Sequence, residues 1–391
     1  MSAPQAASGP QARHTWAGAG LLVVVVVLVL VLVASDAVAP GSFWPAWLVA
    51  CWWCLGPVLG GAAALGIHRL TGGLWGEVLA PAVGALAARL PWVLLLFLPL
   101  LVPVLWPGTT ARPDLYPWAV QDGGTWAHGL SRPAFKLAWF STPFFLARVL
   151  VYAAIALWLV RPAALRRLGQ GRAALSLIVY LLLGSLAAID AVGSLLPRWH
   201  SSVFGLALLA GQLLAGVAAA TWLTARAVAA GQLAVPVPAA GKPPVWRDLG
   251  NLLLMAVMLW AYLAFMQFLV IWAENLPEEI AWFVPRLMTG WRFGGLALVL
   301  LQFALPLALL LFRAVKDRPA RLGWVAALAL FAQMLDAAWL VLPSVAPHDA
   351  AAAALVPLLA VALGLLVFGG VPGAMAQLAA GISTEAPHGP R

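Results

Sequence analysis

The chain has 391 residues, of which 64% are hydrophobic and only 9% are charged. Soluble domains carry about 25% charged residues, so a water-soluble globular protein is excluded, and the recurring apolar runs indicate a polytopic membrane protein. The net charge of +9 does not indicate nucleic-acid binding, because the basic residues lie in short segments between apolar runs, as the positive-inside rule describes.

The first apolar run covers residues 17–35 and could be a signal peptide or a retained helix. Arg13 precedes the run and "AVA" at 37–39 is similar to a cleavage site, but Pro40 follows directly. The run is also longer than the roughly 7–15 apolar residues of a signal peptide. We therefore predict a cytoplasmic tail over 1–16 and a first membrane span that is retained.

Ten runs are apolar over the length that crosses a bilayer, about 20 residues each. They cover 17–35, 43–66, 90–107, 140–160, 174–196, 201–226, 248–273, 292–313, 321–343 and 351–376. We predict an all-α fold, with one transmembrane helical bundle over 17–378 and a C-terminal tail over 379–391. Between the spans, residues 70–89 predict a helix at the membrane interface and residues 107–139 predict a folded outer loop.

Lysine and arginine residues predict the orientation of the bundle. If both termini are cytoplasmic, fifteen basic residues lie on the cytoplasmic side and six on the outer side, which is the expected bias. The six outer residues are Arg112, Arg132, Lys136, Arg198, Arg286 and Arg292.

The motif "CWWC" (Cys51 to Cys54) raises the question of a redox or metal site. It lies inside an apolar run, no second CxxC exists, and Leu55 rather than His follows it, so neither a metal half-site nor haem attachment is indicated. We predict two buried thiols that pack as small apolar groups. The six histidines lie in tails or near span ends, so they do not predict a pair of haem ligands at matched depth. No redox cofactor or metal is expected.

Three charged residues lie inside predicted spans, where each costs at least about 2.5 kcal/mol. These are Arg148, Asp190 and Asp336. Counted from the predicted span ends, all three lie about 9–12 Å below the outer surface, so Arg148 is expected to pair with Asp190, Asp336 or both. The cluster could serve a proton relay or a quinone site, or it could be a buried ion pair that sets helix register.

The stretch "QFLVIWAENLPEEIAWFVPR" (267–286) ends the seventh predicted span. Its candidate outer-face residues are Gln267, Trp272, Glu274, Asn275, Pro277, Glu278, Glu279 and Arg286. Trp272 suits the headgroup depth, Asn275 can end the helix in a left-handed conformation, and Pro277 prevents its continuation. Glu278 and Glu279 suit the start of a short helix. The stretch is therefore either an acidic cap on an outer loop, or a docking surface or proton exit.

Several blocks resemble, in order, the integral membrane subunits of alternative complex III, a bacterial quinol:cytochrome c oxidoreductase. They are "LTGGLWG" (70–76), "DAVGSLLPRWHSSVFG" (190–205), the block 247–279 that ends in "WAENLPEE", "LPLALLLFRAVKDRPARL" (305–322) and "DAAWLVLP" (336–343). The resemblance covers about residues 60–345 and is closest to the smaller subunit, ActF. His200 and Ala273 depart from the family pattern, which has aromatic residues there.

The resemblance implies a subunit of the bacterial inner membrane that is related to NrfD/PsrC proteins and binds no cofactor of its own. It implies a larger homologous membrane subunit, at which quinol is oxidised, and iron–sulfur and haem c subunits as partners. The chain would be structural and proton-conducting rather than catalytic. Arg148, Asp190 and Asp336 would be candidates for an internal proton path, and the outer acidic loop would dock the peripheral subunits.

Two other functions stay open. A quinol-binding NrfD-like dehydrogenase subunit would need an outer apolar pocket with a proton acceptor, for example Asp190 or His200. A secondary transporter would show inverted repeats and helices broken at the midplane, whereas the prolines here lie mostly near the predicted span ends, apart from Pro306.

Overall fold

The computed structural model describes residues 40–105, 115–119, 125–128, 130, 132–161, 169–236 and 243–384. Over these residues the chain is helical and contains no strand, which confirms the all-α prediction. The predicted first span (17–35), the N-terminal tail and the last residues of the C-terminal tail lie outside the described residues.

Eight helical segments are long and apolar enough to cross a membrane. They are α2 (Pro40–Thr71), α7 (Thr142–Leu159), α9 (Gln170–Ala191), α10 (Phe204–Ala229), α11 (Val245–Glu274), α14–η5–α15 (Trp291–Leu298, Val299–Ala304 and Leu305–Leu311), α17 (Pro319–Val345), and α18 with α19 (Ala350–Phe368 and Val371–Thr384). By length and composition, these helices make the chain a multi-pass membrane protein.

The predicted span 90–107 corresponds to the second half of a bent helix pair. This half is formed by α4 (Leu90–Phe97), η1 (Leu98–Leu101) and α5 (Val102–Leu105), and it meets α3 (Leu74–Ala87) at an angle of 43°. If the pair is one span, the described residues hold nine spans. All nine predicted spans from residue 43 onward are thus matched by helix.

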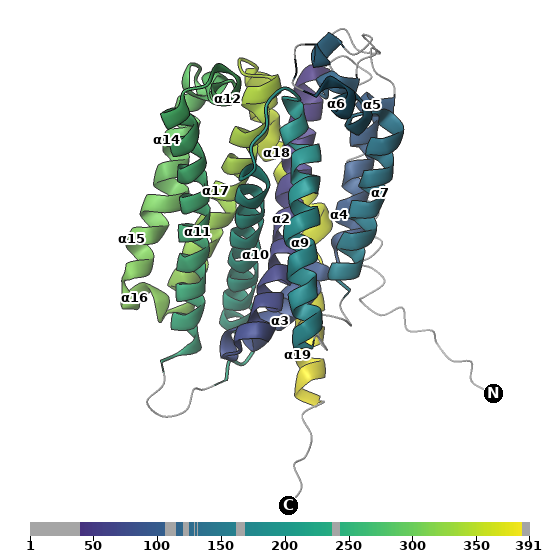
Figure 1. Cartoon of the computed structure of the whole chain (residues 1–391). Helices are drawn as coiled ribbons and strands as arrows, with labels where there is room; N and C mark the ends of the chain where they lie inside the picture. Colours follow the sequence, from purple (N-terminus) through teal and green to yellow (C-terminus); the bar gives the residue numbers. More distant parts are fainter. Residues whose placement is uncertain are drawn as a thin grey trace, which may run out of the picture.

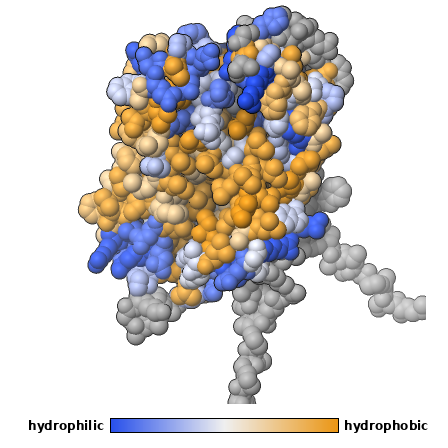
Figure 2. Space-filling model, in the orientation of Figure 1, coloured by the Kyte–Doolittle hydropathy of each residue, from blue (hydrophilic) through white to orange (hydrophobic). Residues whose placement is uncertain are grey.

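Consecutive long helices run antiparallel through the bundle (Figure 1). The helices α3, α16 (Arg313–Lys316) and α19 gather at one end, which we call the basic end. The described basic residues at or beside helix termini there are Arg69, Arg89, Arg161, Arg172, Arg226, Arg247, Arg313, Lys316, Arg318 and Arg321. Figure 2 shows an apolar band between this end and the opposite end, as expected of a membrane-embedded surface.

The centre of the bundle is built from α2, α10 and α17, whose apolar windows are the most buried. At the crossing of α2 and α10 the two backbones touch, because a Cβ added to Gly60 would lie 1.7 Å from the Gln212 carbonyl oxygen. A Cβ added to Gly216 would likewise lie 2.0 Å from the Gly61 nitrogen. Small residues allow such close helix packing in membranes, where dispersion contacts rather than hydrophobicity hold helices together.

The two cysteines of the "CWWC" motif lie in this core as free, buried thiols. Cys51 donates from Sγ to the carbonyl oxygen of Leu96 at 3.2 Å, and Trp47 donates from Nε1 to the same oxygen at 2.9 Å. The prediction that both cysteines pack as core residues is confirmed. The Cys51 and Trp47 side chains attach α2 to α4.

The "LTGGLWG" block forms the turn from α2 into α3. Gly72 and Gly73 have φ values of 73° and 101°, a region that only glycine enters readily. The turn lets His68 Nε2 hydrogen-bond to the Gly73 carbonyl oxygen at 2.7 Å. The helix predicted over 70–89 exists, but most of α3 is buried against α2, α10 and α19 rather than lying freely at an interface.

The substitution Gly72→Ala is expected to lower the free energy of unfolding by about 1–2 kcal/mol, the strain of an L-residue in the left-handed region. A Cβ at Gly72 would meet no atom within 4 Å, so the loss reports backbone strain alone. Gly171→Ala is the matched control, because its Cβ is equally uncrowded and its φ is not positive. Unfolding in mixed detergent micelles measures both, and equal losses would contradict the prediction.

Candidate functional site

Arg148 of α7 and Asp190 of α9 form a buried ion pair near the end of the bundle opposite the basic end. Arg148 Nε lies 2.7 Å from Asp190 Oδ2, and Nη2 lies 3.1 Å from Oδ1. The two residues are only 8% and 2% exposed. This bidentate geometry is the strong form of an arginine–carboxylate contact. It confirms the predicted pairing of these two residues.

Two further donors form hydrogen bonds with the Asp190 carboxylate. Trp139 Nε1 donates to Oδ1 at 3.0 Å, and the Tyr152 hydroxyl donates to Oδ2 at 2.8 Å. Arg148 Nη1 in turn donates to the Trp139 carbonyl oxygen at 2.6 Å, with the guanidinium 4.2 Å from the centre of the Trp139 ring. Full pairing of this kind is what makes a buried ion pair stable, so the cluster joins α7, α9 and α6 (Pro133–Trp139).

Asp336 does not join this cluster, and no ion pair between Arg148 and Asp336 forms among the described residues. Helix α9 ends at Ala191, one residue after Asp190, whereas α17 continues for nine residues after Asp336 to Val345. At about 1.5 Å per residue, Asp336 lies about 14 Å inside its helix end. The prediction that Asp190 and Asp336 lie at equal depth is therefore wrong, because Asp190 lies in the last turn of its helix.

Asp336 instead lies in a separate polar cluster inside the bundle. Trp260 Nε1 of α11 donates to its Oδ2 at 3.3 Å. A small cavity lies beside it, lined by Asp336, Gln333, Gln212 and apolar residues of α2, α10 and α17. The described structure thus divides the three predicted membrane charges between two sites.

The acidic stretch after α11 has the predicted caps. Asn275 ends α11 with φ 53° and donates its backbone N–H to the Ile271 carbonyl oxygen at 3.0 Å. Pro277 begins α12 (Pro277–Ile280). Glu274, Glu278, Pro277 and Trp272 are exposed, Glu279 is half-buried, and Gln267 is buried. The exposed carboxylates are available to a partner, and docking itself stays a hypothesis.

Arg286 of α13 (Val284–Leu287), in contrast, is fully buried, so its guanidinium is not exposed to a partner. Its Nε donates to the Trp339 carbonyl oxygen at 3.1 Å and its Nη2 to the Leu340 carbonyl oxygen at 2.7 Å. Pro343 explains the first of these bonds, because it has no N–H to donate to the carbonyl four residues earlier, that of Trp339. Arg286 supplies the donor that the proline removes from α17.

An aromatic stack continues from Arg286. Its guanidinium lies 3.5 Å from the centre of the Trp282 ring, and Trp282 stacks on Trp199 with ring centres 4.5 Å apart. Trp199 Nε1 donates to the Glu279 carbonyl oxygen at 3.0 Å. Sequence reasoning missed Trp282 and Trp339, although the four-residue spacings Trp282–Arg286 and Trp339–Pro343 were visible signals.

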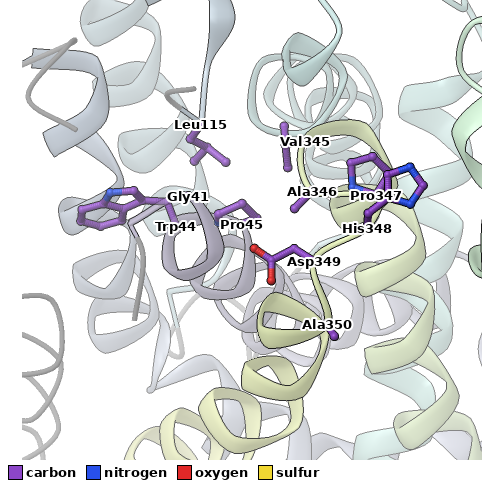
Figure 3. A pocket seen from close by; sticks show the side chains of 10 residues that line it. All are labelled: Gly41, Trp44, Pro45, Leu115, Val345, Ala346, Pro347, His348, Asp349 and Ala350. Carbon is purple, nitrogen blue, oxygen red and sulfur yellow. The ribbon is translucent and has the colours of Figure 1, made fainter. Parts of the chain in front are cut away.

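A cavity of about 450 Å³ opens at the end opposite the basic end. Figure 3 shows it between the start of α2, Leu115 and the turn from α17 to α18. The Asp349 carboxylate reaches toward α2, where the Ser42 hydroxyl donates to it, and it caps α18 by accepting from Ala351 N at 2.9 Å. The residues expected to serve such a pocket, Asp190 and His200, do not line it.

At the basic end, Arg247 and Asp317 form a partly exposed ion pair. Arg247 Nη2 lies 2.6 Å from Asp317 Oδ2 and Nε lies 2.9 Å from Oδ1. The hydrogen bonds from Arg247 lower the pKa of Asp317 below its ordinary value. The pair ties the start of α11 to the connection between α16 and α17.

This ion pair predicts an acid-dependent contribution to stability. Because the folded pKa of Asp317 is lowered, the pair stabilises the protein above the ordinary aspartate pKa and stops doing so as the pH falls through the folded value. Asp317→Asn is therefore expected to lower the melting temperature at pH 7 and to change it little at strongly acidic pH. Glu77→Gln, at an exposed carboxylate of α3, is the control. A melting-temperature difference between Asp317→Asn and the unsubstituted protein that does not change with pH would contradict the prediction.

No protein-family model and no curated protein matches the sequence. Within the described ranges, no group of three His, Cys, Asp or Glu side chains is placed to hold a metal ion. The resemblance to the alternative complex III subunits therefore rests on the sequence blocks.

Proposed function

We propose that the chain is a structural, non-catalytic membrane subunit of a respiratory quinol:electron-acceptor oxidoreductase of the alternative complex III type. One observation carries the proposal: the blocks that resemble this family supply several of the buried polar contacts of the bundle. "DAVGSLLPRWHSSVFG" supplies Asp190 and Trp199, and "DAAWLVLP" supplies Asp336, Trp339 and Pro343. Residues that form these polar contacts are thus among the residues that carry the likeness.

In this assignment the chain lies in the bacterial inner membrane with its basic end and both termini in the cytoplasm, as the positive-inside rule favours. Its lipid-facing helices pack beside a larger homologous membrane subunit. The exposed carboxylates of Glu274 and Glu278 face the iron–sulfur and haem c subunits outside the membrane. Quinol is a ligand of the complex, and this chain holds no redox cofactor.

Affinity purification of the tagged chain from its native membranes tests the assignment. Mass spectrometry is expected to find a second, larger multi-span subunit and an iron–sulfur protein, and the absorption spectrum is expected to show c-type haem. A variant with Glu274→Gln, Glu278→Gln and Glu279→Gln is expected to lose the peripheral subunits but keep the membrane partner. Recovery of a stable monomer from native membranes would overturn the proposal.

The proton-conducting part of the proposal concerns Asp190. Its carboxylate is held by Arg148, Trp139 and Tyr152, so a proton can reach it only if one of these bonds opens. In the purified complex, Asp190→Asn is expected to reduce proton release more than quinol oxidation. Proton release that stays unchanged relative to quinol oxidation would reject this role.

The 450 Å³ cavity favours a second candidate function, quinol binding on this chain. It combines apolar walls, such as Pro45 and Val345, with the carboxylate of Asp349 and the nearby imidazole of His348. Its volume falls in the range of small-molecule sites, about 300–1,000 Å³. A photoreactive quinone analogue would label peptides containing Pro45 or Val345 if this function holds. Labelling confined to the larger membrane subunit would reject it.

A further inference from the structure

The interior cluster around Asp336 contains more polar groups than the chain itself can pair. Asp336, Gln333 and Gln302 are 7%, 7% and 0% exposed. Gln333 Nε2 and both amide atoms of Gln302 have no hydrogen-bond partner in the described part of the chain. Gln302 lies close enough to Asp336 to interact with it, but not in ordinary hydrogen-bond geometry. Native interiors rarely leave such groups unpaired, so the cluster points to an additional polar partner.

A cavity of about 10 Å³ adjoins these groups. Gln212, Gln333 and Asp336 line it with Trp52, Trp53 and Gly56. Its size corresponds to about one water molecule, which needs roughly 10–15 Å³ by this measure and two to four polar partners.

Gly211 of α10 lies directly against Gln333 and Asp336, two of the residues that line the cavity. A Cβ there would lie 3.1 Å from Gln333 Oε1 and 3.5 Å from Asp336 Oδ2. Any residue other than glycine would therefore place a methyl group or more against both polar side chains. The glycine keeps α10 from covering the cluster.

A π-helical segment brings Gln302 to the cluster. Residues Val299–Ala304 (η5) are wound as a π-helix, and Pro306 follows. Pro306 has no N–H for the carbonyl of Gln302, four residues earlier, and its ring would clash with that carbonyl in a regular α-helix. The wider π turn accommodates the proline, and such turns occur frequently at functional sites.

We propose that this cavity binds a single water molecule that accepts a hydrogen bond from Gln333 Nε2 and donates to the Asp336 carboxylate. Water matches both needs, because it accepts and donates, whereas a metal cation cannot accept from an N–H group. Gln212 extends the site, since its Oε1 accepts from the Tyr180 hydroxyl at 2.9 Å. The water then connects Tyr180 and Gln212 to Asp336 and Trp260. The result is a hydrated polar layer across α9, α10, α17 and α11, separate from the Arg148–Asp190 pair, and it requires none of the partners proposed above.

Radiolytic labelling of the purified full-length chain in lipid nanodiscs tests the site. Bound water that is split by X-rays modifies the side chains beside it, so Trp52 and Trp53 are expected to be labelled although Trp52 is only 7% exposed. Gly211→Ala is expected to reduce this labelling several-fold, and Gln333→Leu is expected to do the same without adding bulk on α10. Gly184→Ala is the control, because its Cβ would press on the apolar Leu209 side chain at 3.1 Å.

Two results would overturn the proposal. One is the absence of label at Trp52 and Trp53 in the unsubstituted chain, or label that neither Gly211→Ala nor Gln333→Leu reduces. The other is label that sodium ions suppress in the unsubstituted chain, since that would make the occupant a cation. Equal melting temperatures of the Gly211→Ala and Gly184→Ala variants would show that reduced labelling does not come from unfolding. Should Gly211→Ala fail to fold, Gln333→Leu decides alone.

Discussion

Replacing Arg286 with methionine is expected to lower the free energy of unfolding by about 2–4 kcal/mol, although no acidic partner is lost. Arg286 donates to the carbonyl oxygens of Trp339 and Leu340 inside α17. Each buried acceptor that loses its donor costs about 1–3 kcal/mol, and methionine fills most of the space without donating. The contact with the Trp282 ring, at 3.5 Å, is weakened at the same time. Unfolding in mixed detergent micelles measures the loss.

The cause of the loss can be tested through Pro343. The double variant Arg286→Met/Pro343→Ala restores an N–H to α17 four residues after Trp339, so it is expected to recover part of the stability that Arg286→Met removes. Arg292→Met, at an exposed arginine near Arg286 in the chain, is the control and is expected to have little effect. If Pro343→Ala adds its own loss to that of Arg286→Met, the arginine does not replace the missing backbone bond.

Span positions could be predicted from the sequence because the bilayer leaves few alternatives. A spanning segment must pair its own backbone groups and stay apolar for about 20 residues. This constraint correctly placed helices from α2 to α18. The end of α11 at Asn275 and Pro277 could be predicted for another reason, because the conformational preferences of these two residues are local.

Helix ends inside apolar sequence could not be predicted in this way. Residues 192–196 are as apolar as the helix before them, yet α9 ends at Ala191 and Gly193–Leu195 form a 3₁₀ turn. Hydropathy reports how long a chain stays apolar and does not report where its helix stops. For this reason Asp190 was predicted to lie about 9–12 Å below the outer surface, whereas it lies in the last turn of α9.

The environment of Arg286 was missed for a different reason. Its acceptors are three backbone carbonyls and the Ser344 hydroxyl, which composition does not show, and a lone arginine between span ends suggests an exposed loop. The informative residue was Pro343, because a proline inside a helix frees a carbonyl one turn earlier. Arg148 and Arg286 are therefore paired inside the bundle in two ways: Arg148 through a carboxylate, and Arg286 through backbone carbonyls of α17 and an aromatic stack.

Asp190→Leu is expected to destabilise the bundle by about 3–5 kcal/mol, the typical cost of breaking a buried ion pair by removing one partner. The substitution leaves the Arg148 guanidinium buried at 8% exposure without its carboxylate. It also removes the acceptor of Trp139 Nε1 and of the Tyr152 hydroxyl. The loss should appear as a lower free energy of unfolding in mixed micelles and as weaker resistance of α7 and α9 to proteolysis.

The double variant Arg148→Met/Asp190→Leu distinguishes the two interpretations of this pair, a proton path and an ion pair that sets helix register. Because it removes both charges and keeps the side-chain volume, it is expected to be more stable than Asp190→Leu alone. A double-mutant cycle from these variants and Arg148→Met gives the coupling between the residues. Strong coupling together with normal assembly and quinol oxidation in the double variant would make the pair a device for helix register. A stable double variant that assembles but no longer releases protons would instead assign the pair to proton movement.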